Sequence, residues 1–92
     1  MRIFFLALAA LLAAGVAGAN QDSANACAKA LGKDPRTIYD ASIAAVTADT
    51  NLKDLLTQKT RGLVEAGTVP RDTARDSARA ALKCLELAQQ PN

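Results

Sequence analysis

Apolar residues recur at helical spacing through most of the chain after residue 20, and no stretch shows the period-two alternation of a half-buried strand. Four segments have this spacing, over residues 23–31, 35–48, 52–66 and 70–89. The connections between them are short, which favours antiparallel neighbours. The pattern therefore predicts one all-α domain, a small up-and-down bundle of about four helices.

Local signals mark the ends of these helices. Asp34 followed by Pro35 is typical of a helix start, because a capping carboxylate precedes a proline that needs no N–H partner. Asp49-Thr50-Asn51 supplies capping oxygens before the third helix. Gly32 and Gly67 are placed to end the first and third helices, and Pro91 limits the fourth.

The first nineteen residues have the layout of a secretory signal. Arg2 precedes an apolar run over residues 3–14, and Ala17-Gly18-Ala19 offers small residues at a cleavage site. The run is short for a hydrocarbon core of about 30 Å. We expect residues 1–19 to be a cleaved signal peptide and residues 20–92 to be a single helical domain without a stable membrane anchor. This predicts a periplasmic or secreted protein.

Loss of the signal leaves a domain with a thin core. Both phenylalanines and the only methionine lie in residues 1–19, so Tyr39 is the sole aromatic that remains. Alanine dominates the apolar positions, and each alanine favours helix but buries little surface. A core of this kind contributes only about 3–5 kcal/mol of net stability.

The two cysteines, Cys27 and Cys84, are predicted to form a disulfide, because an even count in an exported chain pairs most simply. Their spacing is unlike a redox C-x-x-C motif. Closing so long a loop is worth about 4 kcal/mol in the chain-entropy model. Folding is therefore expected to depend on this bond.

The fourth helix carries a row of bases at every fourth position. The row consists of Arg71, Arg75, Arg79 and Lys83. Three acids share its sector, and the pairs expected at i,i+3 spacing are Asp72–Arg75, Asp76–Arg79 and Lys83–Glu86. We interpret the row mainly as a solvated face balanced by its own carboxylates. The functional alternative is docking of an acidic protein surface or of lipid headgroups.

Lys59 interrupts the leucine stripe of the third helix, between Leu56 and Leu63. One interpretation is that its stem packs on the leucines while the ammonium reaches water. The other is that this face contacts a partner. The net charge is +2, and Arg2 leaves with the signal, so nothing in the charge balance or the single aromatic favours nucleic acid.

The sequence lacks the residues that several kinds of catalysis require. The chain contains no histidine, so the commonest general base and metal ligand is missing. Paired cysteines leave no thiolate for a nucleophile or a zinc site, and the glycines are not gathered into a phosphate loop. We therefore expect no enzyme activity, no metal and no cofactor.

The sequence leads to the hypothesis of a small exported, non-enzymatic protein that binds another protein in the cell envelope. The candidate partner-binding residues are Lys59, Arg71, Arg75, Arg79 and Lys83. The alternative is a periplasmic acid-stress chaperone, which would expose apolar surface as carboxylates protonate at about pH 3–5. Reversible binding of an apolar dye at low pH with retained helix separates the two hypotheses.

Overall fold

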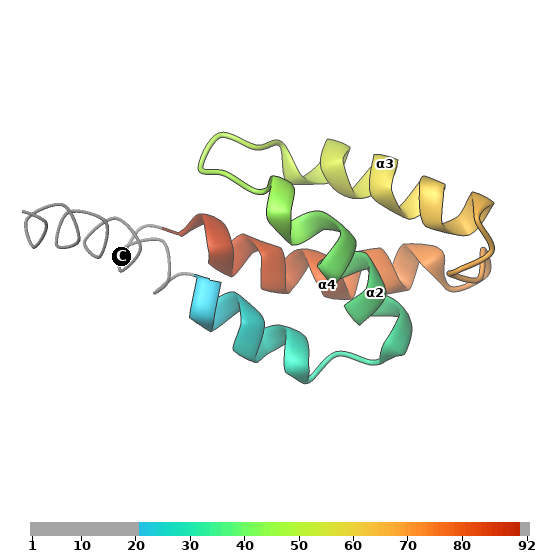
Figure 1. Ribbon diagram of the computed structural model, residues 1–92, viewed down its shortest axis with the longest axis horizontal. Coiled ribbons are helices and arrows are strands. Elements are labelled where there is room, and N and C mark those ends of the chain that lie inside the picture. The colour runs from blue at the N-terminus through green and yellow to red at the C-terminus, as the bar shows by residue number, and fades with distance from the viewer. Residues whose placement is uncertain (1–20, 91–92) are drawn as a thin grey trace, which may run out of the picture.

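The computed structural model describes residues 21–90 of the chain (Figure 1). The proposed signal peptide, residues 1–19, lies outside the described residues. The described part is helical and contains no strand. Its elements are a helical segment over residues 21–29, α2 (Lys33–Ser42), the 3-10 helix η1 (Ile43–Ala45), α3 (Leu52–Glu65) and α4 (Ala74–Gln89). The predicted all-α bundle of about four helices is confirmed.

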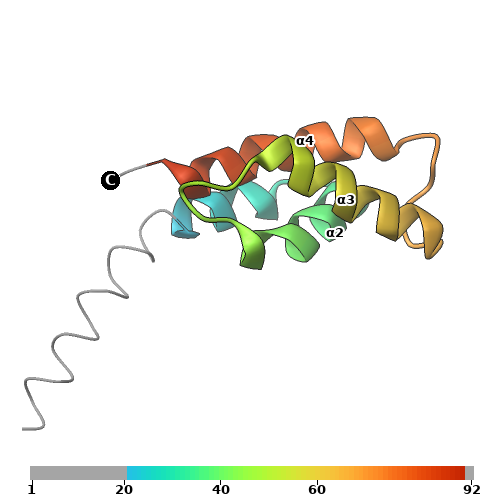
Figure 2. The same cartoon turned by 90° about the horizontal axis from the view of Figure 1, so that it is seen from above.

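The helices run up and down, and each is antiparallel to the next along the chain (Figures 1 and 2). α4 contacts both α2 and α3, and α2 also contacts α3. Segment 21–29 and α3 lie on opposite sides of the α2–α4 pair in Figure 1. No helix in the described part of the chain combines the length and apolar character needed to cross a membrane.

The core is small and centres on α2 and α4. Tyr39 is its largest fully buried side chain, followed by Ile38 and Leu85. The Tyr39 hydroxyl donates to Asn25 Oδ1 over 2.7 Å, which joins segment 21–29 to α2. Burial, followed by the nearby Asp40 carboxylate, raises the pKa of Tyr39. Tyr39, the only aromatic residue in the described part of the chain, thus both fills the core and links two helices.

The predicted disulfide between Cys27 and Cys84 is present. It links segment 21–29 to α4, with the two Cα atoms 5.4 Å apart. Cys84 is fully buried, and Cys27 is half-buried against the core. The bond therefore joins two residues that are 57 apart in sequence, and the loop that it closes contains most of the domain.

The second helix is shorter than predicted and begins differently. It ends at Ser42, passes into η1 and leaves the chain extended at Val46, whereas the sequence predicted helix to residue 48. The Thr50 hydroxyl donates to the Ala45 carbonyl, so a side chain takes an acceptor that further helix would have used. Gly32 is the N-cap residue and has no side-chain hydrogen bond, so the predicted capping role of Asp34 was wrong.

A side chain of α4 also holds the turn between η1 and α3 in place. Gln89, in the last turn of α4, donates through Nε2 to the carbonyls of Thr47 and Thr50, at 2.9 and 2.7 Å. Asn51 then caps α3, as predicted, because its side chain accepts from the Asp54 N–H. The far end of α4 therefore holds the start of α3.

The connection between α3 and α4 determines where α4 begins. Gly67 has a φ of 79°, and the N–H of Thr68 donates to the Leu63 carbonyl, which ends α3 near the predicted glycine. Val69 is buried and anchors the connection in the core. Residues 71–73 form a turn, and α4 starts at Ala74, later than the predicted start near residue 70.

Candidate functional site

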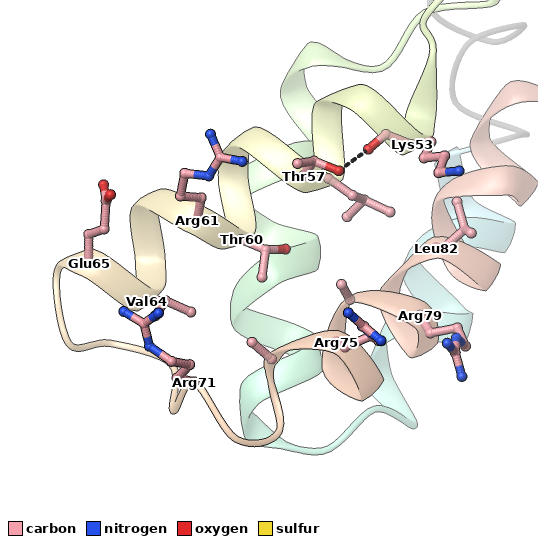
Figure 3. A pocket seen from close by; sticks show the side chains of 13 residues that line it. Lys53, Thr57, Thr60, Arg61, Val64, Glu65, Arg71, Arg75, Arg79 and Leu82 are labelled. Carbon is pink, nitrogen blue, oxygen red and sulfur yellow. Dashed lines mark hydrogen bonds between the residues drawn. The ribbon is translucent and has the colours of Figure 1, made fainter.

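An open groove of about 730 Å³ lies between α3 and α4. α3 forms one wall and α4 the other, and the ribbon of α2 passes behind them in Figure 3. The uncharged side chains that line the groove are Leu56, Thr57, Thr60, Val64, Ala74, Ala78 and Leu82. The charged ones are Lys53, Arg61, Glu65, Arg71, Arg75 and Arg79. The groove is therefore apolar at its base and predominantly cationic at its edges.

Helical periodicity explains why each wall of the groove carries both apolar and cationic side chains. On α3, Lys53, Thr57 and Arg61 follow at four-residue intervals, so they share one side of the helix beside the leucine stripe. On α4, Arg75 and Arg79 are one turn apart, and Arg71 precedes them in the turn that leads into the helix. Each wall thus presents a line of cations next to the line of apolar residues below it.

Within residues 21–90, the groove cations form no ion pair with a carboxylate. The only ion pair in the described part of the chain is Arg36–Asp40, at 3.5 Å on α2. The three pairs expected on α4 (Asp72–Arg75, Asp76–Arg79 and Lys83–Glu86) are not formed, and that expectation was wrong. Exposed i,i+3 pairs are worth only a few tenths of a kcal/mol, too little to hold long side chains in one geometry.

The structure divides the five candidate binding residues into two groups. Arg71, Arg75 and Arg79 all line the groove, whereas Lys59 and Lys83 do not. Lys59 is half-buried, consistent with a stem packed along α3, and Lys83 is exposed on α4. The groove therefore includes the first three members of the basic row but not the fourth.

Two groove cations, Lys53 and Arg61, were not predicted from the sequence. The available signal was their eight-residue spacing, which places them on the same side of a helix. Their position opposite the α4 arginines depends on how the two helices pack, which the periodicity of either helix alone does not specify. Lys53 lies in the first turn of α3 and Arg61 near its end.

Thr60 has a buried hydroxyl that makes no hydrogen bond with the described part of the chain. Its Oγ1 is shielded from solvent and has no partner among residues 21–90. The neighbouring Thr57, by contrast, donates to the Lys53 carbonyl at 2.8 Å (dashed line in Figure 3). A buried hydroxyl without a partner costs about 1–3 kcal/mol. Thr60 therefore makes the folded protein less stable than an apolar residue of the same shape at this position would.

The groove contains no metal-binding arrangement. No group of three or more potential metal ligands of the His, Cys, Asp or Glu type occurs within residues 21–90. Both cysteines are oxidised to the disulfide, so neither is available as a thiolate. What the arrangement can do is bind an anionic partner that also brings apolar surface.

Comparisons with protein-family models, with curated proteins and with solved structures find no match to this chain.

Proposed function

We propose that this protein is a non-enzymatic binding protein of the cell envelope or exterior, and that it binds an acidic protein partner in the groove between α3 and α4. The observation that carries the proposal is the charge of the groove. Five cations and a single carboxylate, Glu65, line it around an apolar base. None of the five cations forms an ion pair within the described residues.

Unpaired cations around apolar surface favour association with an acidic protein for two reasons. The clustered charge steers an acidic partner toward the groove and speeds encounter. The apolar base then supplies burial, which gives most of the affinity in protein interfaces. Arginine is also among the residues that dominate binding energy at such interfaces.

The remaining chemistry supports binding rather than catalysis. The whole sequence lacks histidine, and both cysteines are bonded to each other. The proposal of export is supported by the pattern of residues 1–19 and is compatible with the disulfide, since disulfides persist in oxidising compartments.

Capture of the partner by matched variants tests the proposal. The oxidised protein is immobilised and incubated with an envelope extract of the cells that produce it. Arg79→Glu reverses a groove cation, and Lys83→Glu makes the same change one helical turn away, outside the groove. We expect one acidic protein to be retained in near-equimolar amount by the wild type and by Lys83→Glu, and to be lost with Arg79→Glu.

A second matched pair examines the other wall. Arg61→Glu changes the groove, whereas Lys59→Glu changes α3 outside it. Thermal melts establish that all four variants are folded before capture is compared. Retention of no protein, or equal retention by the groove variants and their controls, would refute the proposal.

A further inference from the structure

The form of the partner follows from the walls of the groove. α3 and α4 have 14 and 16 residues and run antiparallel, so the helices that form the walls are about 21 and about 24 Å long at 1.5 Å per residue. A ligand that fills the groove therefore needs to be elongated and to carry apolar side chains along its length. A helix of about three to four turns, or a short extended strand, has that length.

Backbone hydrogen bonding distinguishes a helical ligand from an extended one. An extended peptide needs external partners for its N–H and C=O groups, and it usually finds them on the edge of a sheet. The groove has no such edge, since both walls are helices, and its base is lined by the side chains of leucine, valine and alanine. An α-helix forms its own backbone hydrogen bonds, so it can lie on an apolar base without leaving N–H and C=O groups unpaired.

The distribution of charge specifies the ligand further. Arg71, Arg75 and Arg79 follow one edge at four-residue intervals, and Lys53 and Arg61 follow the other. A fatty acid has one carboxylate and would leave most of these cations unmatched. A flat lipid surface does not reach the base of a groove, and the lining residues include no aromatic side chain on which a nucleobase would stack.

We propose that the groove binds an amphipathic α-helix of another protein, with apolar residues at helical spacing on one side and Asp or Glu along both flanks. This inference rests on the proposed function and adds the conformation and pattern of the bound segment. Carboxylates at i and i+4 of such a helix advance along its axis in the same steps as Arg75 and Arg79 advance along α4.

Peptide selection tests this inference independently of the natural partner. A display library of random 16-residue peptides is selected on the oxidised protein and counter-selected on the Arg75→Glu/Arg79→Glu variant. We expect the enriched peptides to have apolar residues at i, i+3, i+4 and i+7, flanked by acids. When made synthetically, they should gain helical circular dichroism on binding.

Affinities measured by fluorescence anisotropy then compare the variants. We expect the double variant to weaken binding of these peptides by at least about tenfold, which corresponds to about 1.4 kcal/mol. Lys59→Glu and Lys83→Glu should leave the dissociation constant within about twofold, as expected for charges outside the contact. Raising the salt concentration should weaken binding to the wild type.

The outcomes distinguish the inference from the function on which it rests. Enriched peptides that depend on the groove arginines but gain no helix would overturn the helical ligand and leave the proposed function standing. The same holds if no peptide is enriched while Arg79→Glu still abolishes capture of the partner. If the groove substitutions change neither the binding of the selected peptides nor the capture of the partner protein, both proposals are refuted.

Discussion

Replacing Cys27 and Cys84 with alanine removes the covalent link between segment 21–29 and α4. The bonded residues are 57 apart in sequence. For a loop of this length the chain-entropy relation gives a loss of about 4 kcal/mol at 25 °C, because the unfolded chain regains its freedom. A domain of this size has a total stability of about 4–10 kcal/mol. The double variant is therefore expected to be marginal or unfolded at 37 °C.

Urea denaturation followed by circular dichroism measures this loss. The oxidised wild type, the wild type under a thiol reductant and the double-alanine variant are compared at equal concentration. With a slope of about 1 kcal/mol per molar urea for a small domain, the midpoint should fall by about 4 M. The reduced wild type should unfold close to the double variant.

The reductant provides the matched control, because it should not change the midpoint of the double variant. The reasoning would be refuted by a difference below about 1 kcal/mol between oxidised wild type and double variant, which is too small for the loop-closure term. Such a result would mean that the buried surface alone holds the helices together.

Three further predictions concern single side chains. Tyr39→Phe removes the bond to Asn25 and should cost about 0.5–1.5 kcal/mol in the unfolding free energy. Because burial raises the pKa of Tyr39, the folded state holds the phenolic proton more tightly; wild-type stability should decline as the pH rises above about 10, and the variant should lack this decline. Gln89→Leu should cost about 1 kcal/mol and speed hydrogen exchange of the Thr50 amide, since both bonds to the 47–50 turn are lost. Thr60→Val should raise the melting temperature, because it removes a buried hydroxyl without a partner; an unchanged or lower value would contradict this.

The sequence was sufficient to predict the helices and their covalent link. Apolar spacing distinguished helix from strand, and two cysteines in a chain with an export signal pattern left one simple pairing. Gly67 was recognisable as a helix end, and it adopts a positive φ there. These features depend on local chemistry or on a count of residues, so no knowledge of packing was needed.

The groove could not be predicted in the same way. It depends on the separation of α3 and α4, which is set by the side chains of three helices together. Arg61 and Arg75 contribute to one site only because the helices that carry them are antiparallel neighbours. The early end of α2 was missed for a related reason, since the Thr50 hydroxyl that takes the Ala45 carbonyl comes from beyond the helix.

The positions of the two ends of the described chain have a practical consequence. Residues 21 and 90 emerge at the same end of the bundle, and the connection over residues 66–73 lies at the opposite end (Figures 1 and 2). A tag or surface anchor attached at residue 21 or residue 90 is therefore at the end of the bundle away from Arg71. Protein immobilised through residue 21 and protein immobilised through residue 90 should therefore leave the groove equally accessible, and their sensorgrams should superimpose.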